Sequence, residues 1–416
     1  ETRGAPGSES VLVRLPRNGQ FHAINAFIEQ PDRRLLKREG LDDDGALYKM
    51  FNAVTSGTSG VEKKNRKHEN NADLSAFVSG VNNTSGAAFE RFVFDNVNVP
   101  RQLNYLVATV LTQNNDNMKK NFYLYRDSDG TGEWFQVPWD TDLTWGSHFM
   151  TNDSSADDGI WAREDYVLGG RNQNAPISPS HPFVGTQALP GNRSWNRLIN
   201  KLHGNPRFAE MFRRRLRTVM DDHFSSPGLD DRITELRDSF TADANEDRLK
   251  WGQFGQSQSL ATAIRLLEGR YLAPRRNHLF VTHLEDNADN YPTPQTSSAR
   301  LPSAQSVAPP MQFGAFDENP DSGSQDDEFL EVRNPNAFAV DLTGWSVAGG
   351  IVHEFLPGTV IEANGSLYLS PDVPSFRARR TSPRGNEGRF VQGAYEGQIS
   401  ARGEAIVLLD LSLIHI

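Results

Sequence analysis

The sequence predicts an α+β domain followed by a smaller all-β domain, and three observations carry this prediction. The 416 residues exceed what one ordinary hydrophobic core organises, so two domains are expected. Residues 1–284 mix strand-like apolar runs with helical periodicities, whereas residues 311–416 hold short strands separated by turns. Between them, residues 285–310 have the Pro/Ser-rich composition of a linker. We therefore expect an α+β domain, a linker and a β-sandwich.

The composition excludes several classes of function. Lys and Arg number 43 against 53 Asp and Glu, a net charge of -10, which argues against nucleic acid or an anionic membrane as the main partner. The chain has no cysteine, which excludes disulfides, thiolate zinc sites and cysteine nucleophiles. No apolar run reaches the length of about 20 residues that spans a membrane. The chain starts without Met or a signal peptide and stops in an apolar stretch, so we expect both ends to be truncated.

The first elements are predicted to be a hairpin, a short helix and a strand. Apolar runs at 11–15 and 21–29 flank Asn18-Gly19, and Asn-Gly in such a place is a strong hairpin signal. A short helix and then a strand at 46–51 are expected to follow. The polar stretch 56–71 is predicted to be a solvated loop.

A helix and a second hairpin come next. From residue 99 the spacing of the apolar residues predicts a helix with one buried face that runs into residues 113–114. Strands at 122–125 and 134–137 are then joined by a segment rich in turn residues. Polar residues therefore lie in the loops on both sides of this hairpin: Asp116 and Asn121 before it, and Asp140 and Asp142 after it.

The remaining part of the first domain is predicted to be helical. Residues 147–192 have no clear period and are expected to form a long surface excursion. Asn205 is a predicted helix N-cap with Pro206 at the first helical position. The apolar stripe of that helix leaves Arg213–Arg215 on its predicted solvated side. Helical periodicity is found in four segments: 194–203, 206–223, 229–240 and 257–272.

The polar residues around the second hairpin are candidates for phosphoryl-transfer chemistry. That reaction must orient a hydroxyl nucleophile and hold divalent cations against phosphates, and carboxylates do both. Asp116-x4-Asn121, followed by a hairpin and Asp140, has the order in which protein kinases place their base and their metal-binding Asn and Asp. Asp142 adds a second hard oxygen ligand, which suits Mg²⁺ or Mn²⁺. The alternative interpretation is turn and capping chemistry at the ends of strands.

Residues 114–146, NNDNMKKNFYLYRDSDGTGEWFQVPWDTDLTWG, resemble the signature of the spore-coat CotH kinase family, which closes on Pro-Trp-Asp-x-Asp-x-Thr-x-Gly as residues 138–146 do. The similarity extends over residues 11–285. It implies an atypical protein-kinase-like fold that transfers the γ-phosphate of ATP to Ser or Thr of coat, surface or secreted proteins. In this resemblance Asp116 is the general base, Asn121 a metal or phosphate-orienting ligand, and Asp140 the principal metal ligand, with Asp142 as a further ligand.

The resemblance also suggests roles for Lys49 and Glu29, which would contact the nucleotide phosphates or form the supporting ion pair. A lone lysine on a strand is otherwise typical of a solvated sheet edge. The sequence departs from kinase patterns in two respects. It has no Gly-rich phosphate loop, Walker sequence or His-Arg pair before Asp116, and it lacks the family segment ahead of residue 11.

The C-terminal part is similar to a second family. Residues 329–347 (FLEVRNPNAFAVDLTGWSV) and 355–372 (FLPGTVIEANGSLYLSPD) resemble the lamin-tail domain, an immunoglobulin-like module. Leu342 and Trp345 would lie in its core. The resemblance implies binding or attachment, for example to an envelope or matrix partner, rather than chemistry. We expect its last strand to be incomplete.

Three functional hypotheses remain open from the sequence. The first is a secreted or cell-surface associated bacterial protein kinase with a protein substrate, ATP and Mg²⁺ or Mn²⁺. The second is a non-catalytic, pseudokinase-like binding or structural protein of the surface or envelope, and the third is an acidic metal-dependent hydrolase. A kinase requires Asp116 and Asp140 to converge within reach of one metal ion, whereas a binding module would tolerate their loss.

Overall fold

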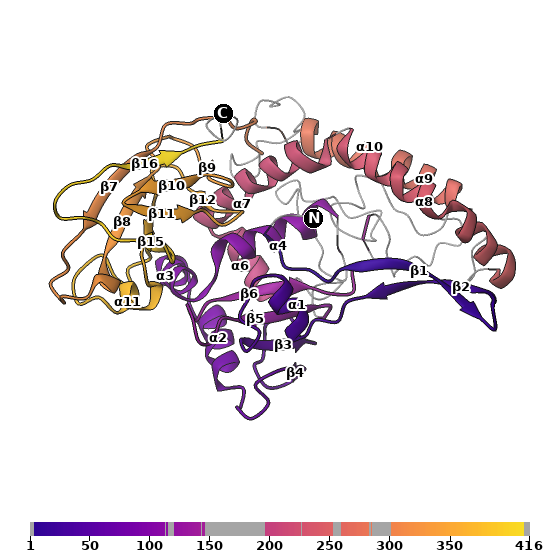
Figure 1. Cartoon of the computed structure of the whole chain (residues 1–416), viewed down its shortest axis with the longest axis horizontal. Helices are drawn as coiled ribbons and strands as arrows, with labels where there is room; N and C mark the ends of the chain where they lie inside the picture. Colours follow the sequence, from indigo (N-terminus) through magenta and orange to yellow (C-terminus); the bar gives the residue numbers. More distant parts are fainter. Residues whose placement is uncertain are drawn as a thin grey trace.

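The protein is a mixed α+β structure, as the sequence predicts, and Figure 1 shows its C-terminal sheets at one end and a long arm at the other. The kinase-like and immunoglobulin-like assignments stay predictions. The computed structural model describes residues 4–112, 114, 120–142, 144–145, 196–225, 227–252, 259–282, 284 and 301–411. The predicted surface excursion at 147–192 lies outside these residues.

A four-stranded antiparallel sheet in the order β4-β3-β5-β6 forms the centre of the N-terminal half. Successive side chains point to opposite faces of a strand, so Tyr48 and Leu124 join the main core while Leu47 and Tyr125 pack on the other side against α1 (Arg33–Arg38). Both faces are therefore covered. The strands are β3 (Ala46–Met50), β4 (Val61–Lys63), β5 (Phe122–Arg126) and β6 (Trp134–Pro138).

The predicted strand at 46–51 and the predicted hairpin at 122–137 are confirmed by β3, β5 and β6. The prediction of a solvated loop at 56–71 is wrong for residues 61–63, because β4 pairs with β3 from Tyr48↔Lys63 to Met50↔Val61. Of the charged residues in β4, Glu62 is exposed, as on an edge strand, while the Lys63 side chain lies over the ring of Tyr48.

Five helices cover the face of the sheet that carries Tyr48. The predicted helix from residue 99 is confirmed by α4, which packs against β6 and α7. α2 and α3 had no counterpart in the prediction, although Leu74, Phe77, Val78 and Val81 have helical spacing. The five are α2 (Ala72–Asn83), α3 (Gly86–Asn96), α4 (Val99–Leu111), α6 (Arg197–Gly204) and α7 (Pro206–Val219).

Helix α7 starts as predicted but is buried on more sides than predicted. The Asn205 side chain accepts hydrogen bonds from the first turn, and Pro206 occupies its first position. The prediction that Arg213–Arg215 face solvent is wrong for two of the three residues: Arg214 and Arg215 are each 3% exposed. The reason is that residues 301–305 and the C-terminal half cover the side of α7 that a simple amphipathic pattern assigns to water.

The C-terminal half is built from two four-stranded sheets, β15-β11-β10-β16 and β14-β13-β8-β7, and a two-stranded pair, β12-β9. Both larger sheets contribute to the continuous core, for example through Val347 and Leu367, and the predicted core residues Leu342 and Trp345 are buried. The likeness of this half to a lamin-tail domain stays a prediction. Its elements are β7 (Gln312–Asp317), β8 (Phe329–Arg333), β9 (Val340–Asp341), β10 (Ser346–Gly349), β11 (Ile351–Glu354), β12 (Val360–Ile361), β13 (Ser366–Leu369), α11 (Val373–Ala378), β14 (Phe390–Gln392), β15 (Glu396–Gly397) and β16 (Ile406–Leu409).

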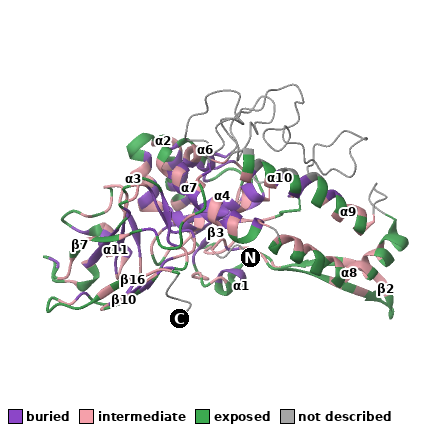
Figure 2. Cartoon of the chain, turned by 90° about the horizontal axis from the view of Figure 1, so that it is seen from above, coloured by how far each residue is buried: buried purple, intermediate pink, exposed green. Residues whose placement is uncertain are grey.

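The two halves share a buried junction rather than a loose connection. The described part of the predicted linker, residues 301–310, is anchored at its start: Leu301 is fully buried, and the Ser303 carbonyl accepts from Arg214. Arg215 of α7 pairs with Asp341 of β9 at 3.1 Å, with both side chains buried. Figure 2 shows buried residues concentrated where the two halves meet. The C-terminal half is thus an integral part of this fold.

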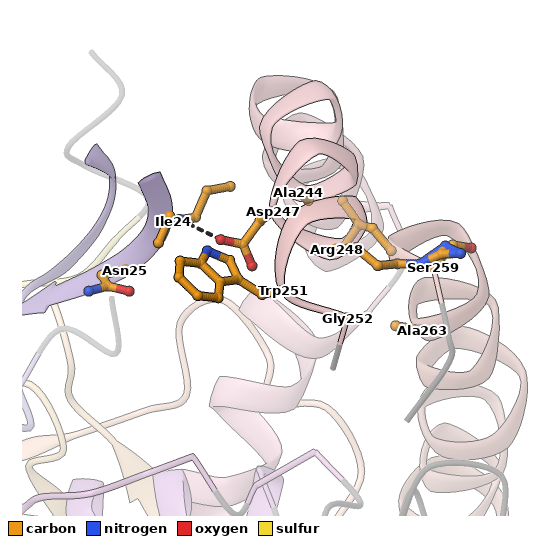
Figure 3. Close-up of a pocket in the computed structure, with 11 residues that line it drawn as sticks. Ile24, Asn25, Ala244, Asp247, Arg248, Trp251, Gly252, Ser259 and Ala263 are labelled. Carbon is orange, nitrogen blue, oxygen red and sulfur yellow. Dashed lines mark hydrogen bonds between the residues drawn. The ribbon is translucent and has the colours of Figure 1, made fainter. Parts of the chain in front are cut away.

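The arm consists of the hairpin β1 (Ser10–Arg17) and β2 (Gln20–Ile28), as predicted, with the long helix α8 (Gly228–Trp251) beside it (Figure 1). The backbone N–H of Ile24 donates to Asp247 at 2.9 Å, and a pocket of about 680 Å³ lies between the hairpin, α8 and α9 (Leu260–Leu266). Figure 3 shows Asp247 and Trp251 facing the hairpin.

The last helices of the N-terminal half return along the arm toward α4 (Figure 1). Helix α8 extends well past the predicted 229–240 and buries none of its residues. Across the described ranges, every helix is too short or too polar to pass through a lipid bilayer. The elements are η1 (Met220–Phe224), α9 (Leu260–Leu266), η2 (Leu267–Leu272), α10 (Ala273–Asn277) and η3 (His278–Thr282).

Candidate functional site

Two of the predicted site residues lie side by side at the open end of hairpin β5–β6. Phe122 pairs with Pro138, and the N–H of Trp139 donates to the carbonyl of Asn121 at 3.2 Å. Asn121 therefore enters the hairpin where Asp140 leaves it. The site is built on the end of a rigid strand pair, which is a favourable base for a fixed constellation of side chains.

Both residues have left-handed backbone conformations. The φ angle is 63° at Asn121 and 55° at Asp140. This region costs energy for most residues but is the one that Asn and Asp visit most readily among residues with a Cβ. Asn121 is buried, whereas Asp140 is exposed. The left-handed backbone therefore explains in part why Asn and Asp occupy these two positions, in addition to any role as metal ligands.

Lys49 lies at the same end of the sheet. Its partner on β5 is Tyr123, two residues after Asn121. Strands flank β3 on both sides, so Lys49 is not on a sheet edge. The Lys49 Nζ lies 5.7 Å from the ring centroid of Trp139 and 5.3 Å from that of Phe51. A cation is thus held beside the residue that precedes Asp140.

The two aromatic residues beside Lys49 were not among the candidates from the sequence. Phe51 is 49% exposed, and Trp139 meets Tyr123 edge to face at 6.0 Å. The signal available for Trp139 was its position next to Asp140. Phe51 carried no signal, because its proximity to Trp139 depends on the pairing of β3 with β5.

Glu29 has a different partner from the one that was considered. It follows β2, and its carboxylate accepts from Arg38 of α1 at 2.6 Å (Nη2–Oε2), with two further contacts from Nε. Arg38 lowers the pKa of Glu29. The described residues contain no ion pair between Lys49 and a carboxylate. Glu29 lines a groove of about 650 Å³ at the base of the arm together with Asp32 and Arg34.

The other two carboxylates complete the list of candidates. Asp142 is exposed, two residues after Asp140. Asp116 lies outside the described residues, so its convergence with Asp140 stays a prediction. Within the described ranges no three His, Asp or Glu side chains gather as a metal centre. The oxygen donors of Asn121, Asp140 and Asp142 nevertheless have the hard-ligand chemistry that suits Mg²⁺ or Mn²⁺, which keep several ligands from water or phosphate.

The far end of the same hairpin is held by the C-terminal half. Arg377 of α11 pairs with Glu133 at 2.5 Å and donates to the carbonyl of Thr131 at 3.0 Å. Asn98 also donates to Glu133 at 2.9 Å. Burial raises the pKa of Glu133, while the guanidinium of Arg377 opposes that shift. The hairpin is therefore fixed at the end opposite to Asn121 and Asp140.

Comparison with known proteins places these residues in context. A family model described as CotH kinase protein matches residues 4–279, which include the arm, the central sheet and the helices that cover it. The chain is also similar to the inner spore coat protein H of Bacillus subtilis (strain 168), with 28% identity over 166 residues, 37% of this chain and 45% of the relative. The chain spans less than half the length of that curated relative.

Proposed function

Because the chain belongs to the CotH kinase protein family, we propose that it is an atypical protein kinase that transfers the γ-phosphate of ATP to Ser or Thr side chains. The observation that carries the proposal is the gathering of Lys49, Asn121 and Asp140 at one end of the central sheet. A cation for phosphate and oxygen donors for a metal ion are the two requirements of phosphoryl transfer.

In the proposed reaction, each residue has one role. Asp116 accepts the proton of the substrate hydroxyl, whose oxygen bonds to the γ-phosphorus while the bond to the β–γ bridging oxygen breaks and ADP leaves. Asp140 and Asn121 hold Mg²⁺ or Mn²⁺, with Asp142 as a further ligand; the ion, when bound, neutralises phosphate charge. Lys49 binds phosphate oxygens as a compact point charge.

The protein substrate is proposed from the same kinship. The relative from Bacillus subtilis is named as a spore coat protein, and we extend this to a coat, surface or secreted protein as substrate and to a surface location for the kinase. The C-terminal half, which resembles a lamin-tail domain in sequence, is proposed to bind an envelope or matrix partner. Its buried junction with α7 also gives it a structural task.

The proposal is tested by incubating the protein with labelled ATP, a coat-protein mixture and Mg²⁺ or Mn²⁺, beside Asp116→Ala and Asp140→Ala. We expect phosphate incorporation by the wild type and its loss in both variants. If the folded wild type neither binds nucleotide nor transfers phosphate, the kinase hypothesis is wrong and the hypothesis of a non-catalytic binding protein takes its place. Metal binding with hydrolysis of other esters, but no transfer from ATP, would favour the hydrolase.

Replacing Lys49 with Met should raise the KM for ATP about 10- to 100-fold, because a charge-assisted hydrogen bond to phosphate is worth roughly 1.5–3 kcal/mol. The apolar stem of Met keeps the contacts with Phe51 and Trp139. The matched control is Lys64→Met, since Lys64 follows the neighbouring strand and pairs with Glu62 at 2.8 Å. Equal KM values for the two variants would remove Lys49 from the site.

A further inference from the structure

The C-terminal end of α4 is bonded by side chains from a distant part of the chain. The last carbonyls of a helix have no partners within it. Here the Arg275 Nη2 donates to the carbonyl of Val110 at 2.6 Å, and the Tyr271 hydroxyl donates to that of Leu111 at 2.8 Å. The backbone N–H of Trp145 donates to the next carbonyl, Thr112, at 2.7 Å. Three consecutive carbonyls are thus held where α4 ends.

Burying the side chains of Tyr271 and Arg275 for this contact costs free energy, because polar groups are removed from water. Tyr271 and Arg275 are four residues apart in a helical run, hence on one face, and both are fully buried. Burial lowers the pKa of Arg275 and raises that of Tyr271. No carboxylate among the described residues pairs with Arg275, and a buried charge is expensive. Its location at a helix C-terminus, where the dipole favours a cation, offsets part of that cost.

The same cluster also holds the loop that follows the second strand of the hairpin. Trp145 comes three residues after Asp142 and has a left-handed backbone with φ 57°. Its ring stacks on Phe224, with centroids 6.4 Å apart and planes 13° apart, and meets Tyr271 edge to face at 6.1 Å. Phe224 and Tyr271 belong to the π-helical segments η1 and η2, and such segments often occur at functional sites.

We infer that Tyr271 and Arg275 are positioning residues for the phosphoryl-transfer site, an inference that rests on the proposed function. They hold the end of α4 and, through Trp145, the loop after β6. The two segments that flank hairpin β5–β6 are thereby tied to each other at Thr112 and Trp145. A displacement of about 1 Å can cost about 100-fold in rate, so a contact at the root of both segments affects catalysis without touching the substrate.

The deciding variant is Tyr271→Phe, which removes one hydroxyl and leaves the ring against Trp145. We expect kcat to fall about 10- to 100-fold with the KM for ATP changed by less than about 2-fold. The matched control is Tyr125→Phe, a buried tyrosine whose hydroxyl donates to the carbonyl of Asp42 at 3.0 Å. That variant should keep kcat within about 2-fold of wild type. Equal kcat losses in the two variants would overturn the inference.

Arg275 is tested with two variants. Arg275→Lys keeps a cation that can donate to Val110, and should retain more kcat than Arg275→Met, which removes both charge and donor. The positioning role of Arg275 is overturned if kcat falls only in proportion to the melting temperature and the Lys and Met variants do not differ at equal stability. Arg275 would then have a structural role only.

Hydrogen exchange separates this inference from the proposed function. In Tyr271→Phe, the amides of Trp145, Thr112 and Asn114 should exchange about tenfold faster, while the rest of the sheet is unchanged. An inactive wild type would refute the kinase, yet local acceleration would still show that Tyr271 holds the two segments. Unchanged exchange at these amides, or acceleration across the whole chain, would refute the positioning role even if the protein is a kinase.

Discussion

Replacing Asp140 with Asn should lower kcat for phosphate transfer about 100- to 1,000-fold, the range seen when one preorganised electrostatic contact to a transition state is removed. The substitution suits the backbone, because Asn accepts the left-handed conformation that Asp140 adopts at φ 55°. Asp140 is exposed and makes no hydrogen bond or ion pair with another described residue, so its loss should leave the melting temperature unchanged. The readouts are initial rates with labelled ATP and thermal unfolding of both proteins.

The control for Asp140→Asn is the same substitution at the other end of the same hairpin. Asp129 lies in the turn between β5 and β6, is exposed, and pairs with Arg66 at 2.6 Å. Asp129→Asn removes a carboxylate of similar exposure from the same supersecondary element, so activity should stay within about 2-fold. If the two variants behave alike, Asp140 is a strand-end residue and the turn-and-capping interpretation of the motif is correct.

The candidate site shows which contacts a local sequence pattern can predict and which it cannot. The approach of Asn121 to Asp140 follows from a hairpin alone, since its two strands must bring their outer ends together. The position of Lys49 depends on β3 pairing with β5, a contact across about 75 residues whose register no local pattern specifies. The partner of Glu29 depends on the position of α1, which brings Arg38 to it, whereas only Lys49 was considered as a partner from the sequence.

The buried arginines show the same limit for helices. Periodicity assigns one stripe of α7 to a core and the remaining positions to water, and Arg214 and Arg215 fall among the latter. Their burial requires residues 301–305 and β9 to lie on that side, which is a property of the assembled fold. Tyr271 and Arg275 were missed for a related reason, because their partners are backbone carbonyls of α4. Every residue has a backbone carbonyl, so the residue type of the partner does not indicate such a hydrogen bond.

The buried junction makes the C-terminal half part of the same fold as the central sheet. Arg215 bridges α4 and β9 by donating to Asn104 at 2.7 Å as well as to Asp341. Arg377 reaches the hairpin that carries the proposed site. Each contact depends on a charge that is buried in the interface, and buried ion pairs are strongly sensitive to the loss of one partner.

Replacing Asp341 with Ala should therefore lower the free energy of unfolding by about 3–5 kcal/mol, because the buried Arg215 loses the carboxylate with which it forms an ion pair. The two side chains are 1% and 4% exposed. Replacing both partners, as Arg215→Met with Asp341→Leu, should restore much of the loss, since apolar groups of similar volume carry no desolvation cost. Urea unfolding, followed by fluorescence and circular dichroism together, measures each value and shows whether the two halves unfold in one transition.

The matched control for Asp341→Ala is the loss of one partner from a solvent-exposed ion pair. Arg232 and Glu235 lie on α8 at 2.6 Å, with side chains 60% and 67% exposed, so Glu235→Ala should change the free energy of unfolding by less than about 1 kcal/mol. A comparably small change for Asp341→Ala, or separate transitions for the two halves in the wild type, would mean that the halves are stable independently. In that case residues 311–411 should fold alone, and their removal should leave phosphate transfer intact.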